Sequence, residues 1–253
     1  MNSQKAAQWL DSFLDAESFA GNDPSKNGLQ VDNGGREIGK AAFAVDACLE
    51  TIERSVKSGA DLLVVHHGLF WRDCELVVGG LYRRLKALLD SGLALYAAHL
   101  PLDAHPEVGN NACIARRLGL GDLMPFGEYR GKVIGFRGVL PSALSVDALL
   151  RLLDPEKAMT ARVLAFGPRE IRTVGVVSGG GADEVHEALA LGLDCFVTGE
   201  IGHEEYHHAL ENGIHVIAAG HYATETFGPR ELMARFSRET GIESVFVDVP
   251  TGL

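Results

Sequence analysis

Two adjacent histidines, His66 and His67, directly follow an apolar run from Leu62 to Val65. Such a run is typical of a buried strand, and ligands bind where the buried parallel strands of an α/β sheet end. Imidazole combined with carboxylate, without cysteine, suits zinc, iron, manganese or cobalt. This strand end therefore predicts a metal site.

Two later apolar segments end in the same kinds of side chain. His99 and Asp103 follow one of them, and His221 and Glu225 follow the other. His221 and Glu225 are four residues apart, so both can meet one ion pair if the segment coils into a helical turn. The strand ends together offer enough groups for two metal ions. The predicted metal ligands are His66, His67, Asp103, His221 and Glu225.

Other polar residues near these strand ends are candidates for catalysis or substrate binding. We expect His99 to orient Asp103, to bind substrate or to move protons, and we expect Glu225 to take part in catalysis. Glycines after the strand that ends at Val177 can present N–H groups to a phosphate, although a tight turn is the simpler interpretation. The candidate substrate-binding residues are Ser178, Gly179, Gly180, Trp71 and Glu200.

Each of these residues also has an ordinary structural interpretation. A histidine at a strand end commonly serves as a hydrogen-bonded packing residue, and an aromatic such as Trp71 commonly packs in a core or interface. Asp103 is also typical of a helix or turn cap, and Glu225 of an ordinary acid in the first turn of a helix. The coincidence of several candidates at matching strand ends favours the metal site.

The segment from His203 to His207 matches the HExxH pattern of zinc proteases. In that pattern two histidines one helical turn apart bind zinc, and a third ligand follows downstream. The surrounding sequence is very polar, which predicts a short exposed helix. Because three fixed positions in five residues arise easily by chance, the pattern is a weaker candidate than the strand-end histidines.

Composition restricts the classes of partner. The 253-residue chain carries a formal charge of −11, which disfavours general attraction to nucleic acid or anionic lipid. No apolar stretch approaches the length of a membrane span, and the N-terminal residues lack the pattern of a signal peptide. The cysteines are scattered without a CxxC pair, which predicts a reduced, cytoplasmic protein. They are Cys48, Cys74, Cys113 and Cys195.

The elements that must position these residues alternate between strand and helix, which predicts an α/β fold. Glycines follow many of the helical segments and mark where they end. The expected strands cover residues 40–47, 62–65, 93–98, 173–177, 195–198 and 215–219. The expected helices cover residues 49–58, 78–91, 110–118, 183–190, 203–211 and 229–240.

The second half of the chain repeats the order of the first. Gly59-Ala60-Asp61 is echoed by Gly192-Leu193-Asp194. We therefore expect two structurally similar lobes, each a mixed β-sheet flanked by helices, with the metal site in the cleft between them. The first lobe would cover residues 1–126 and the second residues 127–253, with the C-terminal segment packing back on the first. Residues 127–167 repeat least and would connect the lobes or open the second.

Several motifs resemble one known family along nearly the whole chain. They are Asn27-Gly28-Leu29-Gln30-Val31, His66-His67-Gly68, His99-Leu100-Pro101-Leu102-Asp103, Gly109-Asn110-Asn111, Val197-Thr198-Gly199-Glu200 and Gly220-His221-Tyr222-Ala223-Thr224-Glu225. Together they look like the GTP cyclohydrolase 1 type 2 homologue family, the Nif-three-like dinuclear metal-centre proteins. The resemblance implies a toroidal homohexamer and two divalent ions per subunit, zinc, iron or manganese, with Glu225 as the bridging ligand.

Two functions follow from this pattern. The first is a metal-dependent hydrolase acting on a nucleotide-like or phosphorylated small molecule, because paired divalent ions activate water at neutral pH. The family label implies ring opening of GTP, with attack at C8 of the purine. The alternative is a non-catalytic metal-binding or regulatory protein that works through partner contacts. The two differ in whether substitution of Glu225 abolishes turnover or only metal retention.

Overall fold

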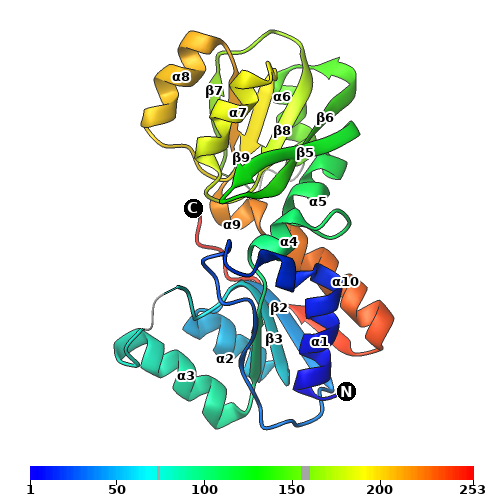
Figure 1. The fold of residues 1–253 in the computed structure, drawn as a ribbon, viewed down its shortest axis with the longest axis vertical. Coiled ribbons are helices and arrows are strands. Elements are labelled where there is room, and N and C mark those ends of the chain that lie inside the picture. Colours follow the sequence, from blue (N-terminus) through cyan, green and yellow to red (C-terminus); the bar gives the residue numbers. More distant parts are fainter. Residues whose placement is uncertain (73–74, 155–159) are drawn as a thin grey trace. The chain divides into compact units, whose positions relative to one another are not determined.

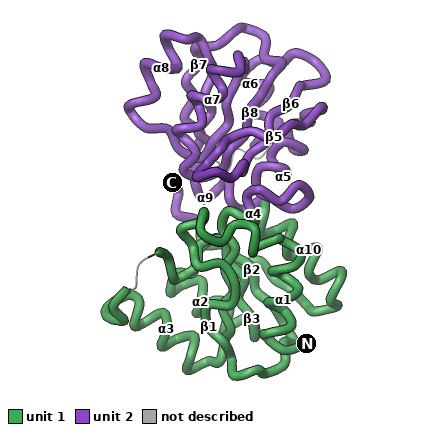
Figure 2. Tube along the Cα trace, viewed as in Figure 1, with its two compact units in different colours: residues 1–102, 228–249 green, residues 103–227, 250–253 purple. Residues whose placement is uncertain are grey.

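A computed structural model describes residues 1–72, 75–154 and 160–253. The chain forms two compact units, shown in different colours in Figure 2. The first contains residues 1–102 and 228–249, and the second contains residues 103–227 and 250–253. This division differs from the expected one after residue 126. The difference arises because residues 110–117 form a helix that packs in the core of the second unit, and residues 121–144 form a hairpin that belongs to its sheet.

The first unit is built on a five-stranded sheet of order β1-β4-β3-β2-β11. β2, β3 and β4 are parallel, β11 joins β2 in parallel, and β1 is antiparallel to β4. The long run of apolar residues in β3 is explained by burial on both faces of a parallel sheet. The strands are β1 (Gly28–Val31), β2 (Lys40–Asp46), β3 (Leu62–His67), β4 (Ala94–Ala97) and β11 (Glu243–Phe246).

Helices cover both faces of this sheet (Figure 1). On one face, Ile52 and Leu88 pack with Leu63 in a core cluster. On the other, Phe43 contacts Phe236, whose ring also meets the edge of Trp9. The helices are α1 (Ser3–Leu14), η1 (Ala16–Phe19), α2 (Leu49–Lys57), α3 (Gly79–Ser91) and α10 (Phe227–Thr240), and α4 (Leu100–Ala104) lies at the unit boundary.

The second unit contains a six-stranded sheet of order β5-β6-β8-β9-β10-β7. Its strands are β5 (Gly121–Tyr129), β6 (Lys132–Leu144), β7 (Arg162–Ala165), β8 (Ile171–Val177), β9 (Cys195–Thr198) and β10 (His215–Ala218). The helices are α5 (Asn110–Arg117), α6 (Val146–Leu153), η2 (Ala182–Glu184), α7 (Val185–Ala190), α8 (Glu204–Asn212) and α9 (His221–Thr224). Ile114 and Leu149, from α5 and α6, pack on Val176 in its core.

The two sheets share one internal pattern, which confirms the predicted mixed α/β fold. In each sheet, three adjacent parallel strands are flanked by an antiparallel strand that comes before them in the chain. The order is β2-β3-β4-β1 in one sheet and β8-β9-β10-β7 in the other. The segment 127–167, for which the sequence left two roles open, supplies β6, α6 and β7 of the second unit.

The repeat extends to single hydrogen bonds. Asp61 Oδ2 accepts from the N–H groups of Gly39 and Lys40, at the start of β2. Asp194 Oδ2 accepts from the N–H groups of Arg172 and Thr173, at the start of β8, and from the Thr173 hydroxyl. In each unit, the aspartate that precedes the second parallel strand thus accepts hydrogen bonds from backbone N–H groups at the start of the first parallel strand. The predicted echo of Asp61 and Asp194 has a structural cause.

We expect Asp194→Ala to destabilise the protein by about 2–3 kcal/mol, because three donors lose a charged acceptor at once. Urea denaturation measures the change in the free energy of unfolding. The matched control is Glu211→Ala, an exposed carboxylate with no hydrogen bond to the described part of the chain, which should stay within about 0.5 kcal/mol. Equal effects of the two substitutions would contradict this role of Asp194.

Two other sequence-based expectations concern cysteines and membranes. The described cysteines, Cys48, Cys113 and Cys195, form no disulfide with one another, and Cys74 lies outside the described residues. Burial raises the pKa of the Cys195 thiol well above its usual range. None of the described helices combines the length and the apolar character that crossing a membrane requires.

Candidate metal centre

The histidine pair lies at the C-terminal end of β3, where the sequence placed it. His66 is fully buried and His67 is partly buried. The next parallel strand, β4, ends at Ala97, so His99 emerges at the same edge of the sheet. This common edge explains how residues more than 30 positions apart in the chain come together.

Each of the three rings is oriented by a hydrogen bond at Nδ1. His66 Nδ1 donates to the carbonyl oxygen of Ala98, at 3.0 Å. His67 Nδ1 lies 2.9 Å from Oδ1 of Asp46, and His99 Nδ1 lies 2.9 Å from Oδ1 of Asp23. Acceptors at Nδ1 fix the proton there and leave the lone pair on Nε2, as in metal-binding histidines.

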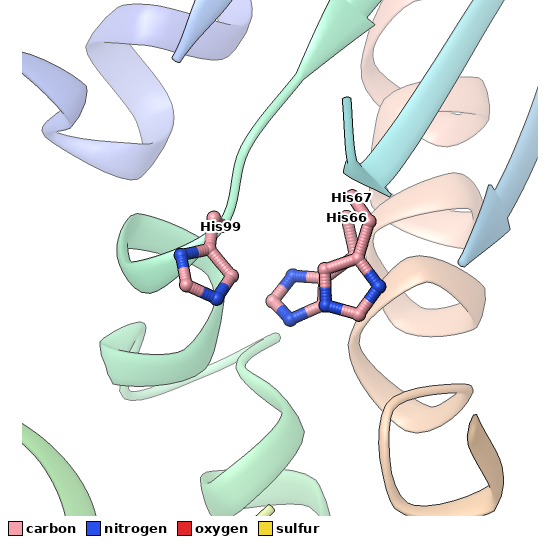
Figure 3. Close-up of side chains that lie close together, drawn as sticks. All are labelled: His66, His67 and His99. Carbon is pink, nitrogen blue, oxygen red and sulfur yellow. The ribbon is translucent and has the colours of Figure 1, made fainter. Parts of the chain in front are cut away.

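The imidazoles form one cluster in the first unit (Figure 3). A ligand nitrogen from each of His66, His67 and His99 lies within 4.8 Å of the other two. The donors are nitrogens backed by carboxylate or carbonyl groups, which is the chemistry that divalent transition metals require. The residues present therefore fit a metal ion, and His99 belongs to the cluster as closely as the predicted ligands do.

The carboxylate behind His99 is held in its ionised form. Burial raises the pKa of Asp23, but hydrogen bonds from His99, Asn27 and the Ser25 N–H lower it, and the net effect is a pKa below the usual range. Trp71 approaches the other side of His99, with ring centroids 5.2 Å apart in an edge-on arrangement. The His99 ring is therefore constrained from two sides.

Asp103 is buried in the second unit and held by polar neighbours. Its Oδ1 accepts from Asn110 Nδ2 at 2.9 Å and from the Ser178 hydroxyl at 3.1 Å. Asn111 supports the same corner, because its Oδ1 accepts from the Ser178 N–H. Ser178, a predicted substrate-binding residue, thus contacts the predicted metal ligand Asp103.

His221 and Glu225 meet one another on the short helix α9. His221 Nε2 lies 3.1 Å from Oε1 of Glu225, and His221 Nδ1 lies 2.6 Å from Oε1 of Glu200. Glu225 is buried, whereas the Glu200 side chain is about half exposed. The predicted pairing across one turn is present, and Glu200 orients the imidazole from behind.

The glycine-rich loop after β8 supports α9. Gly179 N donates to the Thr224 hydroxyl, and its carbonyl accepts from the N–H groups of Gly199 and Glu200. A Cβ atom on Gly179 would overlap Oε1 of Glu225, and it would lie 3.2 Å from His221 Nε2. The loop is thus a close-packed turn against predicted ligands, and Gly180 is its exposed member.

The charge of His221 would make metal binding at this side chain pH dependent. Burial lowers the pKa of His221, but Glu225 and Glu200 outweigh this and raise it to about 9. A metal binds neutral imidazole, so loading at pH 7 must release a proton. We expect metal affinity to fall by about tenfold per pH unit below pH 9 on account of this residue, and to level off above.

Calorimetry of zinc binding in two buffers of different ionisation enthalpy measures the proton released. The His221→Gln variant provides the reference, because its side chain cannot titrate. A proton count at pH 7 that is identical in the two proteins would contradict the assignment.

The histidines of the protease-like motif lie apart from the metal-binding clusters found among the described residues. His203 and His207 are exposed at the start of α8. Among the described residues, neither belongs to a cluster of three metal-binding side chains. The sequence favoured this outcome because the segment is so polar.

Two residues that orient imidazoles were missed by the sequence analysis. Asp46 is the register partner of His67 at the end of the neighbouring parallel strand. Its place at the end of an expected strand was a usable signal. Asp23 lies in an irregular loop 76 residues before His99, and no periodic pattern marked it.

Comparison with known proteins places this arrangement in a family. The family described as Duf34/NIF3 (NGG1p interacting factor 3) matches residues 1–251. The chain belongs to this family. The resemblance inferred from the sequence motifs is thereby confirmed.

Two relatives of this Duf34/NIF3 chain match it over all or nearly all of its length. A protein from Archaeoglobus fulgidus is 47% identical over 253 residues, covering 100% of both chains. One from Halobacterium salinarum is 49% identical, covering 91% of this chain and 92% of its own. Both are named GTP cyclohydrolase 1 type 2 homolog.

Solved structures share the fold. TTHA1606 from Thermus thermophilus is 41% identical with a TM-score of 0.92, and 100% of each chain is covered. Reduced HcgD from Methanocaldococcus jannaschii is 25% identical with a TM-score of 0.86, and 98% of each chain is covered.

Proposed function

We propose that this protein binds two divalent metal ions and uses them to hydrolyse a nucleotide-like or phosphorylated small molecule. The proposed ligands are His66, His67, Asp103, His221 and Glu225, with Glu225 as the bridge. The observation that carries the proposal is the cluster of oriented imidazoles at the end of β3. The His221–Glu225 pair in the second unit supports it with a second set of nitrogen and oxygen donors.

When bound, paired divalent ions supply an activated water and polarise the substrate atom that the water attacks. The remaining work falls to side chains of this chain. Asp46 and Glu200 hold the imidazoles of His67 and His221 in the tautomer that binds metal. We propose that Glu200, whose side chain is half exposed, accepts a proton, and that Trp71 stacks on a planar ring of the substrate.

The names of the relatives indicate the substrate to test first. They are called homologs of GTP cyclohydrolase 1 type 2, so we propose ring opening of GTP as the reaction of this chain. Metal-loaded protein would be incubated with GTP, with other purine nucleotides and with phosphoesters. Purine absorbance and formate release report ring opening, and phosphate release reports ester cleavage.

We expect turnover in the metal-loaded protein and its loss in Glu225→Gln. Val56→Ala, an exposed position on α2 remote from the described donors, provides the matched control. Protein that retains metal but stays inert toward the whole panel would overturn the hydrolase proposal and favour the alternative of a non-catalytic metal-binding protein.

We also propose that the chain assembles into a homohexamer, as the family resemblance implies. Exposed apolar side chains on the β5–β6 hairpin support an interface there, because such patches on antiparallel strands commonly mark protein contacts. They are Leu123, Met124, Val133 and Val139. Light scattering of the purified protein tests this, and a monomeric mass at micromolar concentration would contradict it.

A further inference from the structure

The first unit contains a cavity that the proposed metal chemistry does not use. It has a volume of about 730 Å³ and lies at the C-terminal end of α1, beside η1 and the loop that leads to β1. Its charged lining consists of four carboxylates and two cationic groups, an excess of two negative charges: Asp11, Asp15, Glu17 and Asp23 against Lys26 and Arg72.

Two of these carboxylates lie at the C-terminal end of a helix, where negative charge is unfavourable. Asp11 and Asp15 lie in the last turn and at the C-cap of α1, and that last turn contains no basic residue. The C-terminal end of a helix carries a partial negative charge, so acidic groups there cost stability and a cation is favoured. The side chains of Asp15 and Glu17 have no hydrogen bond or ion pair with any described residue. Their charge is therefore available to a ligand.

A buried hydroxyl at the same wall also lacks a partner. Ser25 lines the cavity and is only 6% exposed, and its Oγ has no hydrogen bond within the described residues. Burying a polar group without a partner is unfavourable, so such groups commonly mark a place where a ligand or water binds. This observation is independent of the acidic charge.

The most buried of these carboxylates, Asp23, is already hydrogen-bonded within the protein. Both oxygens of Asp23 accept hydrogen bonds, from His99, from Asn27 and from the N–H groups of Ser25 and Leu100. Asp23 thus contributes a fixed negative charge rather than a mobile contact. Asp11 is fixed in a similar way, because its Oδ1 accepts from the Tyr96 hydroxyl at 2.8 Å.

We propose that this cavity binds a small organic dication, of the diamine class, separately from the metal centre. Two ammonium groups match the excess of two negative charges, and the flexible Asp15 and Glu17 pair with one of them. The volume greatly exceeds that of a single ion, since one water molecule occupies about 30 Å³. An ammonium group would also supply a donor to the Ser25 hydroxyl once that side chain rotates toward the cavity.

Calorimetry of the purified full chain with putrescine, 1,4-diaminobutane, tests the proposal. The uncharged analogue 1,4-butanediol has the same carbon skeleton and serves as the ligand control. We expect saturable binding of putrescine and none of butanediol. In the double variant Asp15→Asn, Glu17→Gln, affinity should fall by roughly tenfold, while Glu53→Gln, an exposed acid on α2, leaves it unchanged.

The thermal midpoint separates lost binding from lost folding. Because Asp15 and Glu17 have no described partners and Asp15 opposes the helix dipole, the double variant should melt no lower than the parent protein. Absence of putrescine binding, equal binding of butanediol, or unchanged affinity in the double variant would overturn the proposal. Metal content and turnover, measured on the same samples, report the proposed hydrolase function separately.

Discussion

We expect Gly179→Ala to lower the affinity for the proposed metal ions in a protein that stays folded. The added methyl would occupy the position of Glu225 Oε1 and press on His221 Nε2, two atoms that we propose as metal ligands. The backbone adds a second cost, because Gly179 has φ +63°, a conformation that side chains with a Cβ rarely adopt. We expect metal affinity to fall by at least about a hundredfold, as both ligands of α9 are displaced.

The neighbouring glycine provides the control. A Cβ on Gly180 would have its nearest contact at 3.7 Å, to a ring carbon of His221, and the residue carries no positive φ. Metal analysis of Gly180→Ala should match the parent protein. Circular dichroism and the thermal midpoint establish that Gly179→Ala is folded. Full metal content in Gly179→Ala would show that Glu225 does not bind the metal from this position.

The double variant His67→Ala, Glu225→Ala is expected to purify without metal. It removes one proposed ligand from each unit, so no single rearrangement restores the donor set. Elemental analysis should fall from about two ions per chain to near zero, because metals at such centres are held by several protein groups at once. Unchanged metal content would contradict the proposed centre as a whole.

In that experiment the thermal midpoint must be measured together with the metal content, so that loss of metal can be distinguished from loss of folding. The matched control is His203→Ala, His207→Ala, which removes two exposed histidines of α8 and leaves the proposed ligands in place. We expect this control to keep its metal. Loss of metal in the control alone would instead favour the protease-like motif as the binding site.

The sequence predicted the strand ends well, because their signals are local. An apolar run such as Leu62–Val65 needs no distant information, and the imidazoles that follow it must lie at the sheet edge. The repeat was also readable, since Asp61 and Asp194 serve the same backbone donors in the two sheets.

What the sequence left open depends on pairing over long distances or on weak turn signals. β11 pairs with β2 although about 200 residues separate them. The sequence of neither strand indicates which strand it pairs with. The β5–β6 hairpin turns at Arg130-Gly131, both with positive φ. Asparagine or aspartate before glycine is the usual sequence signal for such a turn. This hairpin has arginine at that position, so the sequence does not predict the turn. The contact of Asp23 with His99 could not be predicted either, because a loop has no periodic sequence pattern that would mark its contacts.

The first unit is assembled from two stretches of chain, and this has a consequence for biosynthesis. Residues 1–102 leave the ribosome first, yet α10 and β11 follow only after residue 227. At about 5–20 residues per second, roughly 6–25 s pass before the ribosome reaches them. During that interval β2 lacks its neighbour at the sheet edge, and Phe43 lacks the cover of Phe236. The nascent chain thus exposes an unpaired strand and an apolar face, the features that chaperones bind, while residues 103–227, nearly all of the second unit, can already fold.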